Sequence, residues 1–482
     1  MATELPITNG FYVSRSLPIS HQRCSNVYPS IPSKPALSAE QLLFTPGISI
    51  LTTTGQEVQE FNRGSHVKNG IPYFVNGTSL YRLDLTTERS GGEQLEVFSV
   101  IELGTIEGNE RVSMADNGTQ LLILVPGGKG YIYNEDAGTP FQEITDTDFR
   151  ASGDPQFVEY VDGYFLLTTD SKKFIISAIN DGLSYNALDF ATAESDPDNI
   201  VAPIVLDNLV YITGSETIEG FQNLPSVGRM PFIRNNIILD KGCKAPHSLI
   251  KTNSTFFMVG AGVNESPAIW QFIGGRFRKK SSEAIDQLLA TYSESQINSI
   301  FATSYSDAGS YFVTFTLPDT TLCFEVITER WHERNSLIDE KEERWRVNSL
   351  VAAYGRILVG DYKDGRIGCL SLDSLKEYEN NIIRLFTTQP FSDLGDEIVV
   401  SMLELTMESG AGNSEIEDPV VSFSASKDAK LFSEERVRKI GKKGEYQRRV
   451  IWYRNGRFDR FVVFLFRMSE PIKTAFIKLE FE

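Results

Sequence analysis

The chain has 482 residues, more than a single hydrophobic core usually supports, so two or three domains are expected. Its 64 Asp and Glu residues outnumber its 46 Lys and Arg residues, and the net charge of −18 repels DNA phosphates and excludes a dedicated DNA-binding protein. It contains no run of about 18 apolar residues, so no membrane insertion is expected.

Residues 1–60 are predicted to form an extended N-terminal arm and the first strands. The first 40 residues are rich in Pro, Ser and Asn, so we expect that something else must hold this arm in place. The start of the chain lacks a basic segment followed by an apolar one, which predicts synthesis in the cytoplasm without secretion. The widely spaced cysteines are expected to be free thiols: Cys24, Cys243, Cys323 and Cys369.

Residues 61–376 repeat a pattern of two apolar stretches joined by a tight turn. The spacing of 43 to 55 residues is close to the length of a four-stranded propeller blade, and turns such as Asn-Gly and Asp-Gly favour hairpins. We predict a β-propeller of six or seven blades, the alternative being a series of unrelated β-meanders. The repeats begin at Tyr73, Leu121, Tyr164, Leu209, Phe256, Tyr311 and Arg356.

Helix is scarce in this sequence. Residues 281–292 predict one short helix, with Ser281 or Ser282 as its N-cap and an apolar stripe that includes Ile285 and Leu289. The charged run from Leu337 to Arg344 is predicted to be a solvated helix or loop.

Residues 377–482 are predicted to form a C-terminal β-sandwich that serves assembly, so that the whole chain is mainly β. Leu403, Leu405 and Met407 alternate with polar residues, which is the period of a half-buried strand. The segment from Phe461 to Phe466 is apolar on both faces, as expected of a strand in the middle of a sandwich or beneath a partner.

No catalytic, cofactor-binding or metal-binding residues are predicted, and no cofactor is expected. The pair Cys243 and His247 is a single C-x3-H motif, whereas structural zinc takes four ligands. The alternative is a propeller glycoside hydrolase acting on host-surface polysaccharide, with Asp146 and Asp148 as its carboxylates. In a chain with 64 carboxylates such pairs also arise by chance in solvated loops.

A basic cluster lies between Lys427 and Arg460, where twelve Lys and Arg residues accompany five Asp and Glu residues. This polarisation suits a surface that meets an acidic partner, and the alternative is a solvated loop balanced by the chain's own acids. The aromatic residues of this region are expected in the sandwich core, with Gly456 in a turn between two strands. The candidate subunit or partner interface comprises Arg448, Arg449, Arg454, Arg457 and Arg460.

Four stretches carry a resemblance to a known family through their order and spacing. They are Gln22–Leu51 with its Asn-x-Tyr-Pro and Thr-Pro-Gly segments, Gly214–Phe221 leading into Lys241–Gly260, Gly274–Leu289, and Val450–Lys473 with Trp452, Arg454, Gly456, Arg460 and Pro471. Together they resemble the packaged-DNA stabilisation proteins, the tail-hub or nozzle proteins of short-tailed double-stranded DNA phages. The chain departs from the family at Arg278 to Ser282, where Arg-Lys-Lys-Ser-Ser replaces the more usual Arg-x-Ser-Thr.

The resemblance implies a structural protein of the virion tail that is not an enzyme and is synthesised in the host cytoplasm. It implies a homo-hexamer, a ring beneath the portal and its adaptor (head-to-tail connector) proteins, which closes the DNA channel after packaging. The ring would dock tail fibre or tailspike and tail needle proteins. Double-stranded DNA would pass through the channel without specific binding, as the acidic charge favours. A receptor-binding fibre is a second structural alternative, but the long repetitive stalk of such fibres is missing.

Overall fold

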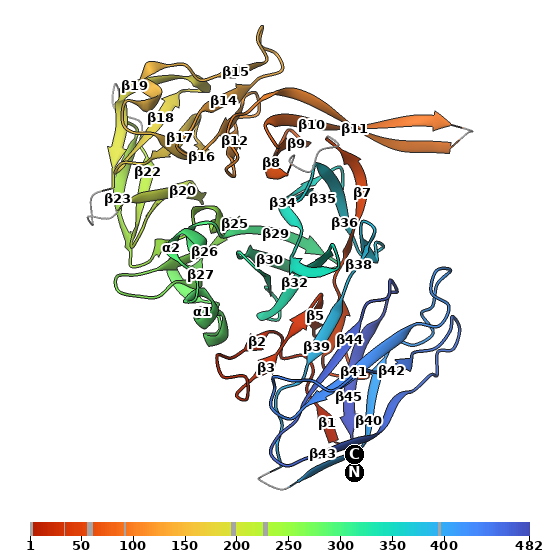
Figure 1. Cartoon of the computed structure of the whole chain (residues 1–482). Coiled ribbons are helices and arrows are strands. Elements are labelled where there is room, and N and C mark those ends of the chain that lie inside the picture. Colours follow the sequence, from red (N-terminus) through yellow and green to blue (C-terminus); the bar gives the residue numbers. More distant parts are fainter. Residues whose placement is uncertain are drawn as a thin grey trace.

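The structure is a computed structural model that describes residues 3–32, 34–54, 61–90, 93–193, 199–224, 230–393 and 397–482. It consists of a β-propeller and a C-terminal β-sandwich, and the two chain ends lie together at the sandwich (Figure 1). This confirms the predicted fold class.

Among the described residues, seven antiparallel sheets surround a common axis and form the blades of the propeller (Figure 1). Blade 1 consists of β8 (Asn62–Lys68), β9 (Ile71–Asn76), β10 (Ser79–Ser90) and β11 (Glu93–Thr105). Blade 2 consists of β12 (Ser113–Asp116), β13 (Leu121–Leu124), β14 (Gly130–Tyr133) and β15 (Phe141–Glu143). Blade 3 consists of β16 (Pro155–Val161), β17 (Tyr164–Thr169), β18 (Lys173–Ala178) and β19 (Asp181–Thr192).

Blade 4 is β20 (Ile200–Leu206), β21 (Leu209–Gly214), β22 (Ile218–Asn223) and β23 (Phe232–Leu239), and blade 5 is β24 (Gly242–Cys243), β25 (Ile250–Thr252), β26 (Thr255–Ala261), β27 (Ala268–Ile273) and β28 (Arg276–Lys279). Blade 6 is β29 (Phe301–Asp307), β30 (Ser310–Thr316), β31 (Thr321–Glu325) and β32 (Arg330–Ile338). Blade 7 contains β34 (Val347–Ala353), β35 (Arg356–Asp361) and β36 (Arg366–Ser371). Each of the seven predicted repeats begins in the strand that opens the central hairpin of a blade.

The outermost strand of blade 7 comes from the start of the chain. β7 (Gly47–Thr53) pairs antiparallel with β36, from Gly47 opposite Ser371 to Thr53 opposite Arg366. A Cβ atom at Gly47 would overlap the carbonyl oxygens of Ser374 and Lys376, so only glycine fits this crossing. The propeller is therefore closed by a strand that precedes all of its other strands in the sequence.

The rest of the N-terminal arm pairs with the chain's own domains. β4 (Cys24–Ser25) lies between β32 of blade 6 and β39 (Arg384–Thr387) of the sandwich, and β1 (Thr3–Leu5) pairs with β45 (Ala475–Phe481). β2 (Tyr12–Val13) and β3 (His21–Gln22) pair with each other. The expectation that another molecule or element must hold this arm is met within the chain itself.

The sandwich consists of two sheets, and the N-terminal arm contributes strands to both. The first sheet has the order β43 (Val450–Phe458), β40 (Ile398–Met407), β45, β6 (Gln41–Phe44) and β5 (Val27–Ser30). The second has the order β4, β39, β44 (Val463–Met468), β41 (Val420–Ser426) and β42 (Arg436–Lys439). The apolar segment from Phe461 to Phe466 enters β44, a central strand of the second sheet, as predicted.

Two short helices lie between blades 5 and 6. α1 (Glu283–Leu289) is the predicted helix, and the Ser282 hydroxyl accepts a hydrogen bond from the Ile285 backbone N–H. α2 (Glu294–Asn298) begins at a capping box formed by Ser293 and Gln296. No helix among the described residues is long and apolar enough to cross a membrane.

The charged run from Leu337 to Arg344 is neither a helix nor a loop, so this prediction was wrong. It forms a hairpin in which β33 (Lys341–Arg344) pairs back onto the end of β32. Asp339 and Glu340 occupy the turn with φ of 48° and 61°, the left-handed geometry that a two-residue hairpin turn needs. Tight-turn geometry thus overrides the helix propensity of the glutamates.

A cluster of buried charges lies where the arm meets blade 6 and the segments just before and just after blade 7. The Arg334 guanidinium donates to the Pro46 carbonyl at 3.0 Å, lies over the Trp345 ring at 4.2 Å and approaches the Glu377 carboxylate at 3.7 Å. Trp345 donates its indole N–H to Glu377 at 2.9 Å, and all of these side chains are almost inaccessible to solvent. Removing one partner of such a cluster leaves an uncompensated buried charge.

We predict that Glu377→Gln lowers the free energy of unfolding by about 3 kcal/mol, because Arg334 then loses its buried counter-charge. Chemical denaturation of the purified chain measures the change. Glu379→Gln, two residues away, is the matched control, because Glu379 pairs with Arg366 while its own side chain is 74% exposed. The control should change stability by less than about 1 kcal/mol, and equal effects of the two substitutions would contradict a stabilising role of the cluster.

Candidate functional site

The candidate interface lies on the edge of the sandwich, where β42 and β43 are the outer strands of the two sheets. The inward side chains of β43 are Val450, Trp452 and Phe458, all buried in the sandwich core. Trp452 packs against Phe423 and Phe466 with ring centroids 5.4 and 5.7 Å away. The aromatic residues of this region therefore form the core, as predicted.

Gly456 does not lie in a turn between two strands, as the sequence had suggested. It lies inside β43, opposite Val400, at a bulge between the pairs Val400–Gly456 and Met402–Tyr453. Gly456 and Arg454 both have positive φ, of 112° and 56°, at this bulge, and glycine adopts such a conformation without strain. The bulge leaves the Arg454 side chain exposed.

Two arginines of the basic cluster serve the fold. The Arg436 side chain donates to the Tyr453 carbonyl at 2.7 Å, and Arg438 donates to the Ile451 carbonyl at 2.9 Å. Both acceptors lie on β43, an edge strand that would otherwise offer these carbonyls to another chain. These two side chains join the sheets and cover that edge.

Two of the five predicted interface arginines lie close to carboxylates of the sandwich, and the other three do not. Arg449 forms two hydrogen bonds to the Glu404 carboxylate, which lower the pKa of that carboxyl below its ordinary value, and Arg457 lies 3.7 Å from Glu397. Arg448, Arg454 and Arg460 are exposed, and among the described residues no carboxylate lies within ion-pair distance of them.

Other lysines of the cluster form pairs with acids of the sandwich, such as Lys439 with Asp418 and Lys442 with Glu417. Exposed pairs of this kind contribute little to stability, typically below about 1 kcal/mol. The chain's own acids therefore balance part of the basic charge, and the three arginines Arg448, Arg454 and Arg460 remain without a counter-charge among the described residues.

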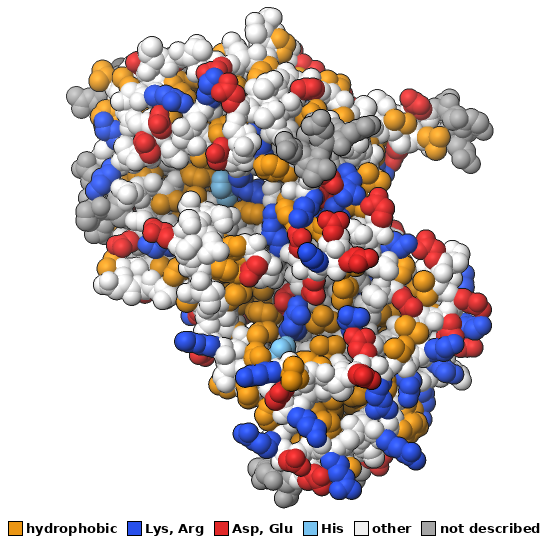
Figure 2. Space-filling model, in the orientation of Figure 1, with side chains coloured by type: hydrophobic (Ala, Val, Ile, Leu, Met, Phe, Trp, Pro, Cys, Tyr) orange, Lys and Arg blue, Asp and Glu red, His pale blue; other side chains and the backbone are white. Residues whose placement is uncertain are grey.

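Large apolar and aromatic side chains are exposed around these arginines. Tyr453 is 57% exposed, and Val399, which lies opposite Arg457 in the strand pairing, is 51% exposed. Figure 2 shows Lys and Arg side chains over the sandwich at lower right, with hydrophobic side chains between them. Tyrosine and arginine beside apolar residues are typical of protein interfaces. Sequence reasoning identified the arginines but missed the exposed Tyr446, Tyr453, Val399, Val437 and Leu431.

The carboxylates proposed for a glycoside hydrolase have structural roles. Asp146 caps the 3-10 helix η1 (Thr147–Arg150) by accepting from the Asp148 backbone N–H at 2.8 Å, and it also accepts from the Tyr185 N–H. Asp148 accepts from the Ala187 N–H at 3.1 Å. Both side chains fasten η1 to β19 and do not face each other across a cleft.

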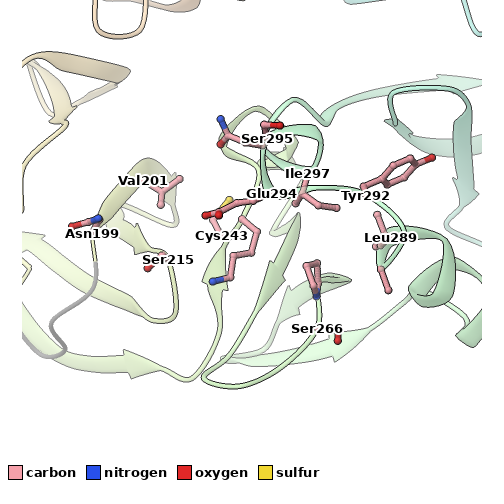
Figure 3. A pocket seen from close by; sticks show the side chains of 14 residues that line it. Asn199, Val201, Ser215, Cys243, Ser266, Leu289, Tyr292, Glu294, Ser295 and Ile297 are labelled. Atoms are coloured by element: carbon pink, nitrogen blue, oxygen red, sulfur yellow. The ribbon is translucent and has the colours of Figure 1, made fainter.

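A groove of about 780 Å³ lies between blades 4 and 5 and the two helices. Figure 3 shows Leu289, Tyr292 and Ile297 on one side of it and Asn199 and Val201 on the other. Its cysteine, Cys243, donates to the Ala245 carbonyl, and burial raises the pKa of the thiol to about 12. At neutral pH this thiol is protonated and unreactive. All four cysteines are buried free thiols, as predicted.

Comparison with known proteins identifies the family that the sequence resembles. The family model described as "Bacteriophage P22 Gp10, beta-propeller" matches residues 3–375, and "Bacteriophage P22 Gp10, beta-sandwich" matches residues 383–482. The chain belongs to this family. The tail hub protein gp10 of Salmonella phage P22 is 21% identical over 434 residues, which are 86% of this chain and 88% of that protein.

The family is one of structural phage tail hub proteins and not of enzymes, so the expectation of a non-enzymatic component of the virion tail is confirmed. Solved structures resemble the chain only weakly. A computationally designed Ika8 protein is 12% identical, with 67% of this chain and 99% of that chain covered at a TM-score of 0.35. BamB from Moraxella catarrhalis is 11% identical, with 67% and 97% covered at a TM-score of 0.37.

We predict that replacing Asp146 and Asp148 together by Asn leaves infectivity of the phage intact. Asn keeps one acceptor oxygen, so the cost should be the loss of one hydrogen bond at Asp146, about 1 kcal/mol of stability. Plaque counts and thermal unfolding measure the two effects. A large loss of infectivity with normally assembled particles would contradict a purely structural role of these carboxylates.

Proposed function

We propose that this tail hub protein forms a homo-hexameric ring below the portal and its adaptor proteins, closes the DNA channel after packaging and docks other tail components. Membership of the P22 Gp10 family supports the position in the tail. The proposed docking partners are tail fibre or tailspike and tail needle proteins, and double-stranded DNA passes through the ring without specific binding.

The observation that carries this proposal is the set of exposed arginines on β43 and the segments beside it that have no counter-charge in the described part of the chain. Arg454 directly follows the exposed Tyr453 on β43, and the exposed Arg448 and Arg460 lie just before and just after this strand. Arg436 and Arg438 already cover backbone carbonyls of this edge. Such a surface favours a partner that offers acidic side chains over one that adds a strand. The chain outside the basic cluster has a large acidic excess, so a second copy meets this requirement.

The acidic balance of the chain also suits a DNA conduit. Tight binding of a duplex needs many phosphate contacts from Lys and Arg. A net charge of −18 opposes such binding, so a duplex would slide past the ring rather than adhere to it.

We predict that Arg454→Glu combined with Arg457→Glu prevents ring assembly while the single chain still folds. Each reversed charge at an acidic interface should cost about 2 kcal/mol or more, and the cost is repeated at every subunit contact of a ring. Native mass spectrometry of the purified chain, alone and with the adaptor, scores the hexamer. Circular dichroism and the unfolding temperature of the monomer test the fold.

The matched control is Arg276→Glu combined with Arg278→Glu, which reverses two exposed arginines on β28 of the propeller. It changes the net charge equally and should leave assembly unchanged. Normal assembly of the Arg454 and Arg457 variant would defeat the interface proposal in favour of a solvated surface. Normal rings that leak packaged DNA would instead indicate that the arginines contact DNA.

A further inference from the structure

Inner segments of all seven blades line two adjoining cavities on the propeller axis. The inner one, of about 230 Å³, is the axial cavity, and Ser65 of blade 1, Arg111 of blade 2, His247 of blade 5 and Ser349 of blade 7 contribute to its lining. The outer one, of about 560 Å³, is its mouth and includes Phe157 of blade 3. Arg111 and His247 line both cavities, so the two lie against the same pair of side chains.

Arg111 is a cation held in place without a counter-charge. Its guanidinium lies 3.6 Å from the centroid of the Phe301 ring and donates one hydrogen bond, of 2.7 Å, to the Asn348 carbonyl. Among the described residues no carboxylate lies within ion-pair distance of it, while a second cation, Arg344, lies over the same ring at 5.7 Å. Burial and Arg344 lower the pKa of Arg111 to about 9, so it still carries its charge at neutral pH.

The rest of the lining of the axial cavity offers hydrogen-bond donors and, among the described residues, no acid, whereas Glu110 and Asp170 line the mouth. The hydroxyls of Ser65 and Ser349 are buried and have no hydrogen-bond partner among the described residues, and Ser349 is 5% exposed. His247 packs edge-on against Phe157, and burial followed by Arg111 lowers the pKa of its imidazole to about 3, so the ring is neutral and can donate. The chain has 64 Asp and Glu residues, and none of those that the structure describes lines the axial cavity.

We propose that the axial cavity binds a phosphate group, either as free inorganic phosphate or as the phosphate of a nucleotide whose base and sugar occupy the mouth. Arginine presents a fork of N–H donors that matches phosphate oxygens, and a stacked guanidinium loses little freedom on binding. A water molecule could satisfy the serine hydroxyls but would leave Arg111 uncompensated, whereas an oxyanion meets both needs.

Such binding would raise the stability of the folded propeller through contacts at its axis. The ligand would contact inner segments of blades 1, 2, 5 and 7, which are far apart in the sequence. A ligand that binds only the folded state raises its stability by mass action. The phosphate would therefore act as a structural ligand of the closed propeller.

The test titrates two probes, inorganic phosphate and deoxyadenosine monophosphate, into the full-length chain. Chloride salt is adjusted to keep the ionic strength constant. Calorimetry should give saturable binding, and the unfolding temperature should rise with the logarithm of ligand concentration. Tighter binding of inorganic phosphate assigns the site to the free ion, and tighter binding of the nucleotide assigns it to a nucleotide. No saturable binding of either probe overturns the proposal.

Two variants test the named residues. Arg111→Gln should lower phosphate affinity about tenfold or more, because a charge-assisted hydrogen bond is lost. Ser349→Ala should lower affinity about threefold, yet without phosphate it should be no less stable than the original chain, because it removes an unpartnered hydroxyl. Arg356→Gln is the control: Arg356 lies over the Phe98 ring at 5.1 Å and pairs with Glu96 outside the cavity.

The control should bind phosphate as the original chain does. Unchanged affinity in both Arg111→Gln and Ser349→Ala would overturn the assignment of the site, even if phosphate binds elsewhere. If Arg111→Gln does not fold, Ser349→Ala together with Ser65→Ala decides. Neither hydroxyl has a partner among the described residues, so their loss breaks no hydrogen bond of the fold.

Discussion

The pairing of β7 with β36 is the interaction on which the rest of this structure depends. It closes blade 7 with a strand from residues 47–53, so the propeller cannot be complete until the two ends of its sequence have met. Closing so long a loop costs entropy, but that cost grows only slowly with length. The benefit is that β36 gains a hydrogen-bonded partner along its length, and covered strand edges do not pair with other chains.

The same crossing determines where the sandwich lies. Once β7 is fixed, the residues before it must leave blade 7 beside the strand that starts the C-terminal domain, and β4, β5 and β6 become strands of that domain. Arg334 donates to the Pro46 carbonyl one residue before β7, and Glu377 lies one residue after Lys376, whose carbonyl closes over Gly47. The backbone pairing of β7 and the buried charges of Arg334 and Glu377 therefore lie at the same place. The two domains are joined there by packed residues and not by a linker. In the proposed ring, such a junction would keep the two domains of a subunit at a fixed angle.

Sequence reasoning predicted structural features that are encoded within a few residues and missed those that depend on contacts between distant segments. Hairpins such as the one that begins at Tyr73 could be found because turn residues and apolar alternation lie within a few residues of each other. The partner of β7 could not be found, since nothing in residues 47–53 specifies a strand 320 residues later. The hairpin at Asp339 and Glu340 was missed because its turn is encoded by backbone geometry and pairing rather than by glycine. At the candidate interface, charge counting located the arginines, while the bulge at Gly456 and the exposure of Tyr453 depend on the packed sandwich.

The arginines of this chain show why a count of charges in a sequence window is a weak guide to an interface. Arg63, Arg334 and Arg384 are buried and donate to backbone carbonyls of segments that lie far away in the sequence. The buried Arg346 pairs with Asp361. Arg436 and Arg438 belong to the basic cluster by sequence, yet their side chains donate to carbonyls of β43 and so belong to the fold. An arginine can satisfy several acceptors at once, which suits it to such crossings better than lysine. Charge reversal at Arg436 would therefore unfold the sandwich edge and say nothing about a partner. The informative positions are those whose guanidinium has solvent around it and no acceptor in its own chain, and in the described part of the cluster these include Arg448, Arg454 and Arg460.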